Sequence, residues 1–360
     1  MAGIFGILGL DDNDRSFVNT IGQDVVYEAS QQLMARYNAD LMAAMSVFIE
    51  EQTEGFKERY KLPGGGRLQE RGGLASSGAV KASGYYDVAY PLRDYGAQIG
   101  GDRVSLAYMR INEYQNHLDT IMLQNTNTVR WAILHALLDD QAGSAETFVD
   151  PIHGSLSVVP LANGDSVVYP PVLGSESEAT EDHYAETGYT VANMSDTNNP
   201  FVTGKNELEE HFGAPLGGSD IVAFCNTDVI AKAEDLTDYD AVPDRYVRPG
   251  QDTDVPFGLP SVPGVIRGRT NGVWVAEWRW IPATYILFLH LGAPPPLKMR
   301  VDPADTGLPR GLTLVAEDEM YPLQTAHYVN RFGLGCGNRL SACVIEVAAD
   351  GSYTIPASYT

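Results

Sequence analysis

The sequence predicts an α+β fold on three observations. Two long segments, 24–54 and 104–138, contain neither glycine nor proline and repeat apolar residues at the helical period. Short apolar runs elsewhere are separated by Asn-Gly and Asp-Gly pairs, which are typical of antiparallel hairpins. Strands and helices do not alternate regularly, and no repeat of fixed period occurs, so a doubly wound parallel sheet or a barrel is disfavoured.

The two helices differ in length. The first is predicted over Asp24–Glu54, after an extended N-terminal arm, and its apolar residues recur at steps of three and four: Met34, Tyr37, Leu41, Met45 and Phe48. The second is predicted over Val104–Leu138. At about 1.5 Å per residue it would span ~50 Å, whereas the average globular helix has roughly 11–12 residues. We therefore expect the second helix to organise the rest of the fold.

A glycine-rich segment, Phe56–Arg103, separates the two helices. Its glycine density prevents a helix and disfavours a core, yet it contains the strand-like run Tyr85–Tyr90. It carries seven of the chain's 24 basic residues: Lys57, Arg59, Lys61, Arg67, Arg71, Lys81 and Arg93. Long connections inside compact domains are normally functional or disordered. We predict a two-stranded arm that projects from the body and is ordered by lying on an acidic surface; a flexible surface loop is the alternative.

Three hairpins are predicted after the second helix, with turns at Asn163-Gly164, Asn271-Gly272 and Asp350-Gly351. The paired strands are 155–161 with 166–169, 265–269 with 273–281, and 341–347 with 353–355. In the second hairpin, alternation places Trp274, Trp278 and Trp280 on one face.

The region between the first two hairpins mixes helix and strand. A buried strand is predicted at Ile221–Cys225, followed by a helix that Asn226 or Thr227 caps and that runs to about Leu236. A short helix is predicted over 207–212 and an apolar strand over 285–291. The stretch 237–263 is rich in proline and is predicted to be a loop.

The net charge excludes several classes of protein. The 47 acidic and 24 basic residues leave a formal charge of −23, which is opposite to the basic footprint of a nucleic-acid binder or of a protein drawn to anionic membrane. No signal peptide is expected, and no run approaches the roughly 18 apolar residues of a membrane span. The three cysteines, Cys225, Cys336 and Cys343, are widely spaced and suit a reducing compartment.

Candidate chemistry is sparse, and we expect no enzyme, no cofactor and no metal. The acidic cluster around His183 could bind a metal, but a solvated acidic loop explains it better in a chain with 47 carboxylates. The segment Asp150–Gly154 resembles an active-site fragment, but it equally suits a turn. The glycines of 334–338 lack the Lys-Ser/Thr of a phosphate loop. A soluble metal-dependent hydrolase using His153 and His183 is the alternative from a different class.

The order of segments resembles that of the major capsid proteins of tailed double-stranded-DNA bacteriophages. Encapsulin shells and the floor domain of herpesvirus capsids share that fold. The C-terminal stretch 328–347 adds to the resemblance. It has an arginine and an aromatic at Arg331-Phe332, a glycine turn, then Asn338-Arg339 and a terminal strand.

The resemblance implies a division of the chain. It gives an N-terminal arm and helix (1–55), an extended loop (56–103), a peripheral domain with a spine helix (104–203), an axial domain (204–323) and a return to the peripheral domain (324–360). The loop at 237–263 would be an axial tip loop. The extended loop would contact the neighbouring subunit through seven residues: Arg67, Arg71, Lys81, Tyr85, Tyr86, Tyr90 and Arg93. We expect deletion of Pro63–Tyr90 to abolish assembly and leave the body folded.

The resemblance also implies a function and partners. The chain would be a structural protein that self-assembles, as pentamers and hexamers, into the icosahedral shell of a phage head. The shell would enclose the double-stranded DNA genome without sequence-specific binding, and it would form in the host cytoplasm. Portal and cement or decoration proteins would be partners, and no membrane would be involved. An encapsulin-like nanocompartment is the nearest alternative.

Two features depart from many members of that group. The first helix starts near Asp24, which leaves no room for a cleaved scaffolding segment, so scaffolding would be separate or absent. Lys81 and Asn338 have the residue types of an inter-subunit isopeptide cross-link. Since most capsids of this type are not cross-linked, we expect none here.

Overall fold

The structure is a computed structural model. It describes residues 23–62, 68, 70, 84–102, 108–139, 146–161, 168–169, 179–180, 182–212, 221–241, 263–318 and 323–359. Backbone contacts divide the chain into two compact units. The first unit comprises Met1–Ala43, Leu92–Ala132 and Arg300–Gly333, and the second comprises Ala44–Pro91, Ile133–Met299 and Leu334–Thr360. This division cuts across the predicted peripheral and axial ranges, which stay a prediction.

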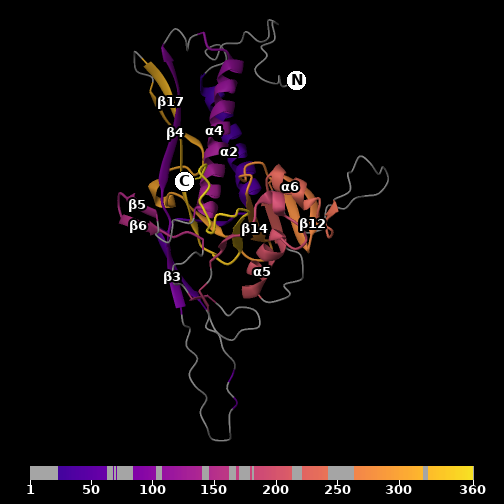
Figure 1. The fold of residues 1–360 in the computed structure, drawn as a ribbon. Helices are drawn as coiled ribbons and strands as arrows, with labels where there is room; N and C mark the ends of the chain where they lie inside the picture. Colours follow the sequence, from indigo (N-terminus) through magenta and orange to yellow (C-terminus); the bar gives the residue numbers. More distant parts are fainter. Residues whose placement is uncertain are drawn as a thin grey trace. The chain divides into compact units, whose positions relative to one another are not determined.

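Among the residues that the structure describes, the first unit contains two long helices and three strands. Helices α2 (Gln23–Met45) and α4 (Ile111–Leu138, which continues into the second unit) lie side by side (Figure 1). Strand β17 (Leu323–Cys336) pairs antiparallel with β16 (Thr313–Asp318) and with β4 (Arg93–Asp102). The apolar cluster of this unit consists of Met34, Leu118, Ile121, Leu312 and Tyr328.

Hydrogen bonds between distant segments hold the first unit together. The Tyr37 hydroxyl donates to the Met122 carbonyl at 2.8 Å, which joins α2 to α4. The Asn38 side chain exchanges two 3.0 Å hydrogen bonds with the backbone of Leu312. Asn38 thereby satisfies both backbone polar groups of Leu312, the residue before β16.

Both long helices are shorter than predicted. Residues 46–48 form a turn after α2, and 49–53 form strand β1 (Ile49–Thr53), which pairs with β15 (Leu297–Arg300). Phe48, predicted on the helix face, is fully buried against the rings of Phe224 (5.6 Å) and Trp278 (5.4 Å). Tertiary pairing and packing therefore override helix propensity here. Helix α4 begins at Ile111, so its 28 residues span about 42 Å.

The second unit contains a seven-stranded mixed sheet. Its order is β11 (Asp240–Ala241), β12 (Val265–Thr270), β13 (Val273–Glu277), β10 (Ile221–Cys225), β14 (Tyr285–His290), β18 (Ala342–Glu346) and β9 (Tyr184–Glu186). Strand β10 pairs parallel with β13 and antiparallel with β14. Every residue of β10, β14 and β18 is buried, which explains their unbroken apolar runs.

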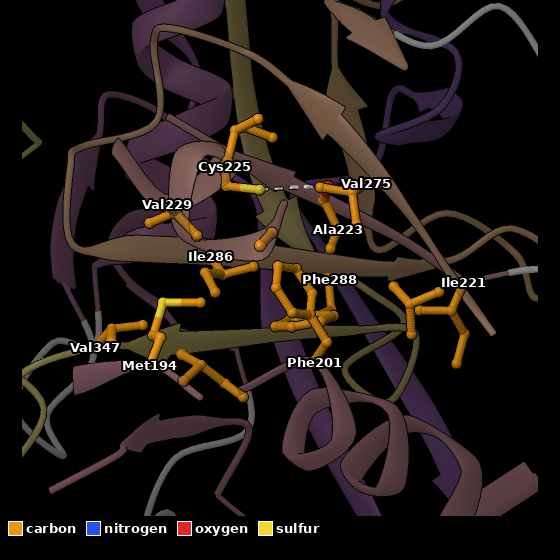
Figure 2. Packing of buried hydrophobic residues seen from close by; sticks show 14 of the residues in the cluster. Met194, Phe201, Ile221, Ala223, Cys225, Val229, Val275, Ile286, Phe288 and Val347 are labelled. Atoms are coloured by element: carbon orange, nitrogen blue, oxygen red, sulfur yellow. Dashed lines mark hydrogen bonds between the residues drawn. The ribbon is translucent and has the colours of Figure 1, made fainter. Parts of the chain in front are cut away.

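Two helices contribute to the core of this sheet. Helix α5 (Pro200–Phe212) includes the predicted 207–212 helix and starts earlier, because the Asn199 side chain accepts from the Phe201 amide and Pro200 suits the first helical position. The Asn226 side chain caps α6 (Thr227–Ala233) by accepting from the Thr227 amide at 2.6 Å, as predicted. Figure 2 shows Phe201 of α5 and Val229 of α6 packed with Phe288 and Ile286.

One of the three predicted hairpins is confirmed. Strands β12 and β13 are joined by Asn271 (φ 48°) and Gly272 (φ 86°), a type I′ arrangement. Strand β13 ends at Glu277, however, so the predicted tryptophan face is wrong beyond that residue. The chain turns there, with the Ile281 amide donating to the Trp278 carbonyl at 3.0 Å, and Trp278 is buried while Trp280 is exposed.

The other two hairpin predictions are wrong. Strand β6 (Gly154–Val158) pairs with β5 (Glu146–Asp150) instead of with β7 (Val168–Tyr169), which pairs with β8 (Ala179–Thr180). At the C-terminus, 353–355 is not a strand. The Thr354 amide donates to the Glu346 carboxylate at 2.7 Å, which replaces the expected ladder hydrogen bond. Two short 3-10 helices, η3 (Val191–Asn193) and η4 (Ala304–Thr306), complete the described elements.

Among the helices that the structure describes, none combines the length and apolar content that crossing a bilayer would require. The predicted N-terminal arm, the turn at Asn163-Gly164 and most of the 237–263 loop lie outside the described residues.

Candidate assembly arm

The predicted two-stranded arm is present in the part of the segment that the structure describes. Strand β2 (Lys57–Leu62) pairs antiparallel with β3 (Gly84–Ala89), in a register that runs from Lys57↔Ala89 to Leu62↔Gly84. The prediction carried the arm to Arg103, but Arg93–Asp102 forms β4 of the first unit and pairs with β17. We call the paired strands β2 and β3 the ribbon, and the end at Lys57 and Ala89 its root.

The root has a core of its own, which no pattern in the sequence predicted. Tyr86, Val88, Tyr90 and Tyr169 are buried together, and Tyr60 packs against them. The Tyr60 and Tyr86 rings are stacked with centroids 5.3 Å apart. Deletion of Pro63–Tyr90 would therefore remove core residues, so the expectation that the body stays folded without them is corrected.

Two glycines of the C-terminal stretch make room for these rings. A Cβ atom on Gly335 would lie 2.6 Å from Cδ1 of Tyr90, and one on Gly337 would lie 2.7 Å from the Tyr60 hydroxyl. The Tyr86 hydroxyl donates to the Gly337 carbonyl at 2.6 Å. Close approach of aromatic rings to the backbone thus explains glycine at both positions.

A buried arginine completes the root. The Arg339 guanidinium lies over the Tyr86 ring at 5.2 Å and near the Tyr169 ring at 5.9 Å, and the residue is almost fully buried. A planar, weakly hydrated guanidinium suits such stacking better than an ammonium does. Burial raises the pKa of the Tyr86 hydroxyl above its ordinary value, so this tyrosine stays protonated and can donate to Gly337.

A polar network lies beside the aromatic rings. The Glu58 carboxylate accepts from the hydroxyls of Tyr60 (2.9 Å), Thr53 (2.9 Å) and Tyr90 (3.3 Å) and from the Lys298 ammonium (3.2 Å). Partial burial alone would raise the pKa of Glu58, but hydrogen bonds from Thr53, Tyr60 and Lys298 outweigh it and lower the pKa. The ionised carboxylate therefore ties β1, β2 and β15 together at the root.

The exposed side of the ribbon carries an ionic cluster. Asp87 of β3 accepts from Arg59 of β2 at 2.6 and 2.9 Å and from Lys57 at 2.9 Å, and the Arg59 guanidinium lies 4.3 Å from the Tyr85 ring centroid. Hydrogen bonds from Arg59 and Lys57 hold the pKa of Asp87 well below its ordinary value. Two of the seven basic residues counted in the segment are thus already paired within the chain.

The structure separates the predicted contact residues into groups. Tyr85 is 61% exposed and stays a candidate, and Arg93 is half-buried on β4. Tyr86 and Tyr90 are buried in the root of their own chain. Arg67, Arg71 and Lys81 lie outside the described residues.

The expectation that Lys81 and Asn338 form no cross-link stays a prediction. Lys81 lies outside the described residues, and the half-buried Asn338 donates to the Pro294 carbonyl at 2.8 Å.

Sequence reasoning missed the residues that anchor the ribbon. Lys298 lies 240 positions from Glu58, and no local pattern connects them. The sequence pointed to the glycines and Arg339 of 328–347 only through the resemblance of this stretch to phage capsid proteins. Their packing against Tyr86 and Tyr90 required the fold.

The residues of the hydrolase alternative are not brought into one site. The Asp150 carboxylate accepts from the amides of Ile152 and His153, both at 2.9 Å, which makes the segment a turn. The His153 ring stacks on Phe56, whereas His183 is fully buried and its Nδ1 lies 2.9 Å from the Ala342 carbonyl oxygen. Within the described ranges, no group of three or more His, Cys, Asp or Glu residues could hold a metal ion.

The three cysteines are free and buried. Burial raises the pKa of the Cys336 thiol to about 12, so the thiolate that reacts or binds metals is disfavoured there.

Comparison with solved structures gives matches along nearly the whole chain. A chain from Mycobacterium phage Patience is 19% identical, with 96% of this chain and 94% of that one covered and a TM-score of 0.68. A chain from the asymmetric unit of the bacteriophage PhiM1 mature capsid is 12% identical, with coverages of 85% and 86% and a TM-score of 0.51. No model of a protein family and no curated protein sequence matches. The predicted tailed-phage major capsid fold is confirmed.

Proposed function

We propose that this chain is a structural shell protein that self-assembles into the icosahedral head of a tailed phage. The observation that carries the proposal is the match, at a TM-score of 0.68, over 96% of the chain to a phage protein. The ribbon supports it, because its root is anchored by buried side chains while Tyr85 and Leu68 are exposed. A projecting arm with a fixed root suits contact with another subunit.

The proposal includes the finer features that the fold alone does not establish. The shell would consist of pentamers and hexamers, would enclose double-stranded DNA without sequence-specific binding, and would form in the host cytoplasm before becoming part of the virion. A portal protein would be a partner, as would cement proteins and a separate scaffold where these exist. The charge of −23 supports this assignment, since a wall that repels DNA does not hold the genome while it is packaged.

The division into extended loop, peripheral domain and axial domain is part of the same proposal. The ribbon and the segment up to Tyr90 would belong to the extended loop, with Arg67, Arg71, Lys81 and Tyr85 as contacts to the next subunit. Arg93, on β4, would be a further contact outside that loop. No catalytic residue, cofactor or metal has a role in it.

Negative-stain electron microscopy of the purified chain tests the proposal. We expect closed, isometric particles, and size-exclusion chromatography should show them far above the 39.1 kDa of one chain. A stable monomer under all conditions of salt and concentration would contradict the proposal. Particles that contain an enzyme, with no DNA in particles from infected cells, would favour a nanocompartment shell instead.

A further inference from the structure

The turn between β12 and β13 brings two cations close to one point. Gly272, with φ at 86°, is the second residue of this turn. A Cβ atom on Gly272 would lie 3.3 Å from Nζ of Lys205 on α5 and 3.9 Å from Nη2 of Arg269 on β12. Apart from the two flanking residues, no other described atom lies within 4 Å of that position. In the described part of the chain, the space beside Gly272 is therefore bounded by two positive charges and is otherwise open.

The Arg269 guanidinium is held in place but lacks an acceptor. It lies over the Trp274 ring, 5.4 Å from the centroid, which fixes its position. Among the residues that the structure describes, none accepts a hydrogen bond from it, and its Nε is buried. Asp240 lies opposite Arg269 in the β11–β12 ladder and forms no ion pair with it there. A guanidinium has five N–H donors in a fork that matches the oxygens of an anion, so these donors favour an anionic partner.

The Lys205 ammonium is held at the same point from the helix side. Its Nζ donates to the Asn271 carbonyl at 3.2 Å and lies 3.8 Å from the Glu209 carboxylate, one turn further along α5. An ammonium has three N–H donors, the carbonyl takes one, and 3.8 Å is too long for a hydrogen bond to Glu209. Lys205 can therefore donate to a further acceptor, and Glu209 offsets only part of the positive charge.

We infer that the space beside Gly272 binds one phosphate group, held between the Lys205 ammonium and the Arg269 guanidinium. Two cations near one point repel each other, and an oxyanion between them replaces this repulsion with two charge-assisted hydrogen bonds. Glycine at 272 keeps the space open for the anion. The inference goes beyond the proposed shell function and does not depend on it. The phosphate group can come from the free ion or from a nucleic-acid backbone, and the test separates these sources.

Thermal unfolding of the unassembled full chain in inorganic phosphate tests the site. Phosphate also stabilises proteins by exclusion from their surface, so each chain is compared with itself in chloride at equal ionic strength. The unfolding midpoint of the full chain should rise more than that of Arg269→Gln or Lys205→Gln, because a bound ligand stabilises by mass action. Arg267→Gln removes the same charge from the same strand, but its guanidinium is already paired with Glu277, so this control should keep the full rise. Equal rises in all four chains would overturn the inference.

Phosphorus NMR titration measures the binding directly and identifies the source. Two charge-assisted contacts suit a dissociation constant of about 1 mM for inorganic phosphate, and Arg269→Gln should weaken it about tenfold or more. We expect a short double-stranded DNA without terminal phosphates not to compete, because the chain is strongly acidic, which assigns the site to the free ion. Competition by the DNA would instead assign the site to a nucleic-acid backbone. Absence of saturable phosphate binding by the full chain would overturn the inference and leave the shell function standing.

Discussion

The sheet core and the arm root lie in one unit but are stabilised in different ways. Around Phe288 and Ile286 the buried side chains are almost all aliphatic or aromatic, and the hydrogen bond drawn among them is the long one from the Cys225 thiol to the Ala223 carbonyl, at 3.9 Å (Figure 2). Around Tyr86 and Tyr90 the buried side chains are mostly tyrosines, packed on glycines and on one buried arginine, and the hydroxyls of Tyr86 and Tyr90 are hydrogen-bonded.

The difference shows what each region requires. Apolar packing depends more on the total volume of the buried side chains than on their exact shape. The sheet core therefore contributes stability and does not fix a direction. The hydroxyl, carboxylate and guanidinium contacts of the root have fixed directions, so they set the angle at which the ribbon leaves the body. Substitutions in the core should change the free energy of unfolding most. Substitutions in the root should affect assembly out of proportion to their effect on stability.

The largest effect is expected in the sheet core. Phe288 is fully buried, and Phe288→Ala should lower the free energy of unfolding by about 3–5 kcal/mol through lost burial and a residual cavity. Denaturant titration of unassembled subunits measures it. Ile286→Val is the matched control and should cost only about 0.5–1.5 kcal/mol. Equal losses for the two variants would show that this core is not tightly packed.

The root should be intolerant of a single added methyl group. Gly335→Ala places a Cβ atom 2.6 Å from Tyr90 and 3.1 Å from the Ala89 carbonyl oxygen, so the ring or the strand must move. Overpacking of this kind should cost about 1–3 kcal/mol and should reduce particle yield. Gly96→Ala, whose Cβ atom would meet its nearest neighbour at 3.4 Å, should change stability by less than about 1 kcal/mol. Normal particles from Gly335→Ala would refute the packing described for the root.

A smaller effect is expected from one hydroxyl. Tyr86→Phe removes the donor to the Gly337 carbonyl but keeps the ring, so it should cost about 1 kcal/mol in thermal or chemical unfolding. Tyr85→Phe, on the exposed side of the same strand, should have no measurable effect on stability. If the two substitutions behave alike, the Tyr86 hydrogen bond does not anchor the ribbon.

The ionic cluster on the ribbon predicts a pH dependence. The pKa of Asp87 is lowered in the folded chain, so its stabilising contribution is complete above the ordinary pKa of about 3.9 and is lost as the pH falls through the lowered value. In Arg59→Gln the pKa of Asp87 should rise toward its ordinary value, and the loss should begin at a higher pH. NMR titration of the Asp87 carboxyl carbon measures this shift. Lys61→Gln on the same strand should leave the titration unchanged.

Features that local sequence dictates could be predicted. The Asn226 cap, the Asn271-Gly272 turn and the buried strand at Ile221–Cys225 each depend on residues within a few positions. Their physical causes are hydrogen bonds or backbone preferences of neighbouring residues. The arm was also predicted, because glycine density, tyrosines and basic residues occur together in one segment.

Features that depend on distant residues could not be predicted. Residues 49–53 were predicted to continue the first helix. They form β1 instead, which pairs with β15, some 245 positions later. The Thr354 amide donates to the Glu346 carboxylate, and 353–355 forms no strand. Lys298 of β15 donates to Glu58 of β2. Tyr86 and Tyr90 looked like contacts to another subunit because their burial partners, Gly335, Gly337 and Arg339, are about 250 positions away.

Removal of the outer arm tests most directly whether the arm acts between chains. Leu62 and Gly84 are the last pair among the residues that the structure describes, so an Asn-Gly turn can replace residues 63–83 and close the ribbon as a two-residue hairpin. The root, including Tyr86 and Tyr90, stays intact. Electron microscopy should then show no closed particles, while the thermal unfolding midpoint of the subunit stays within a few degrees of that of the full chain. Normal closed particles from this variant would contradict the account.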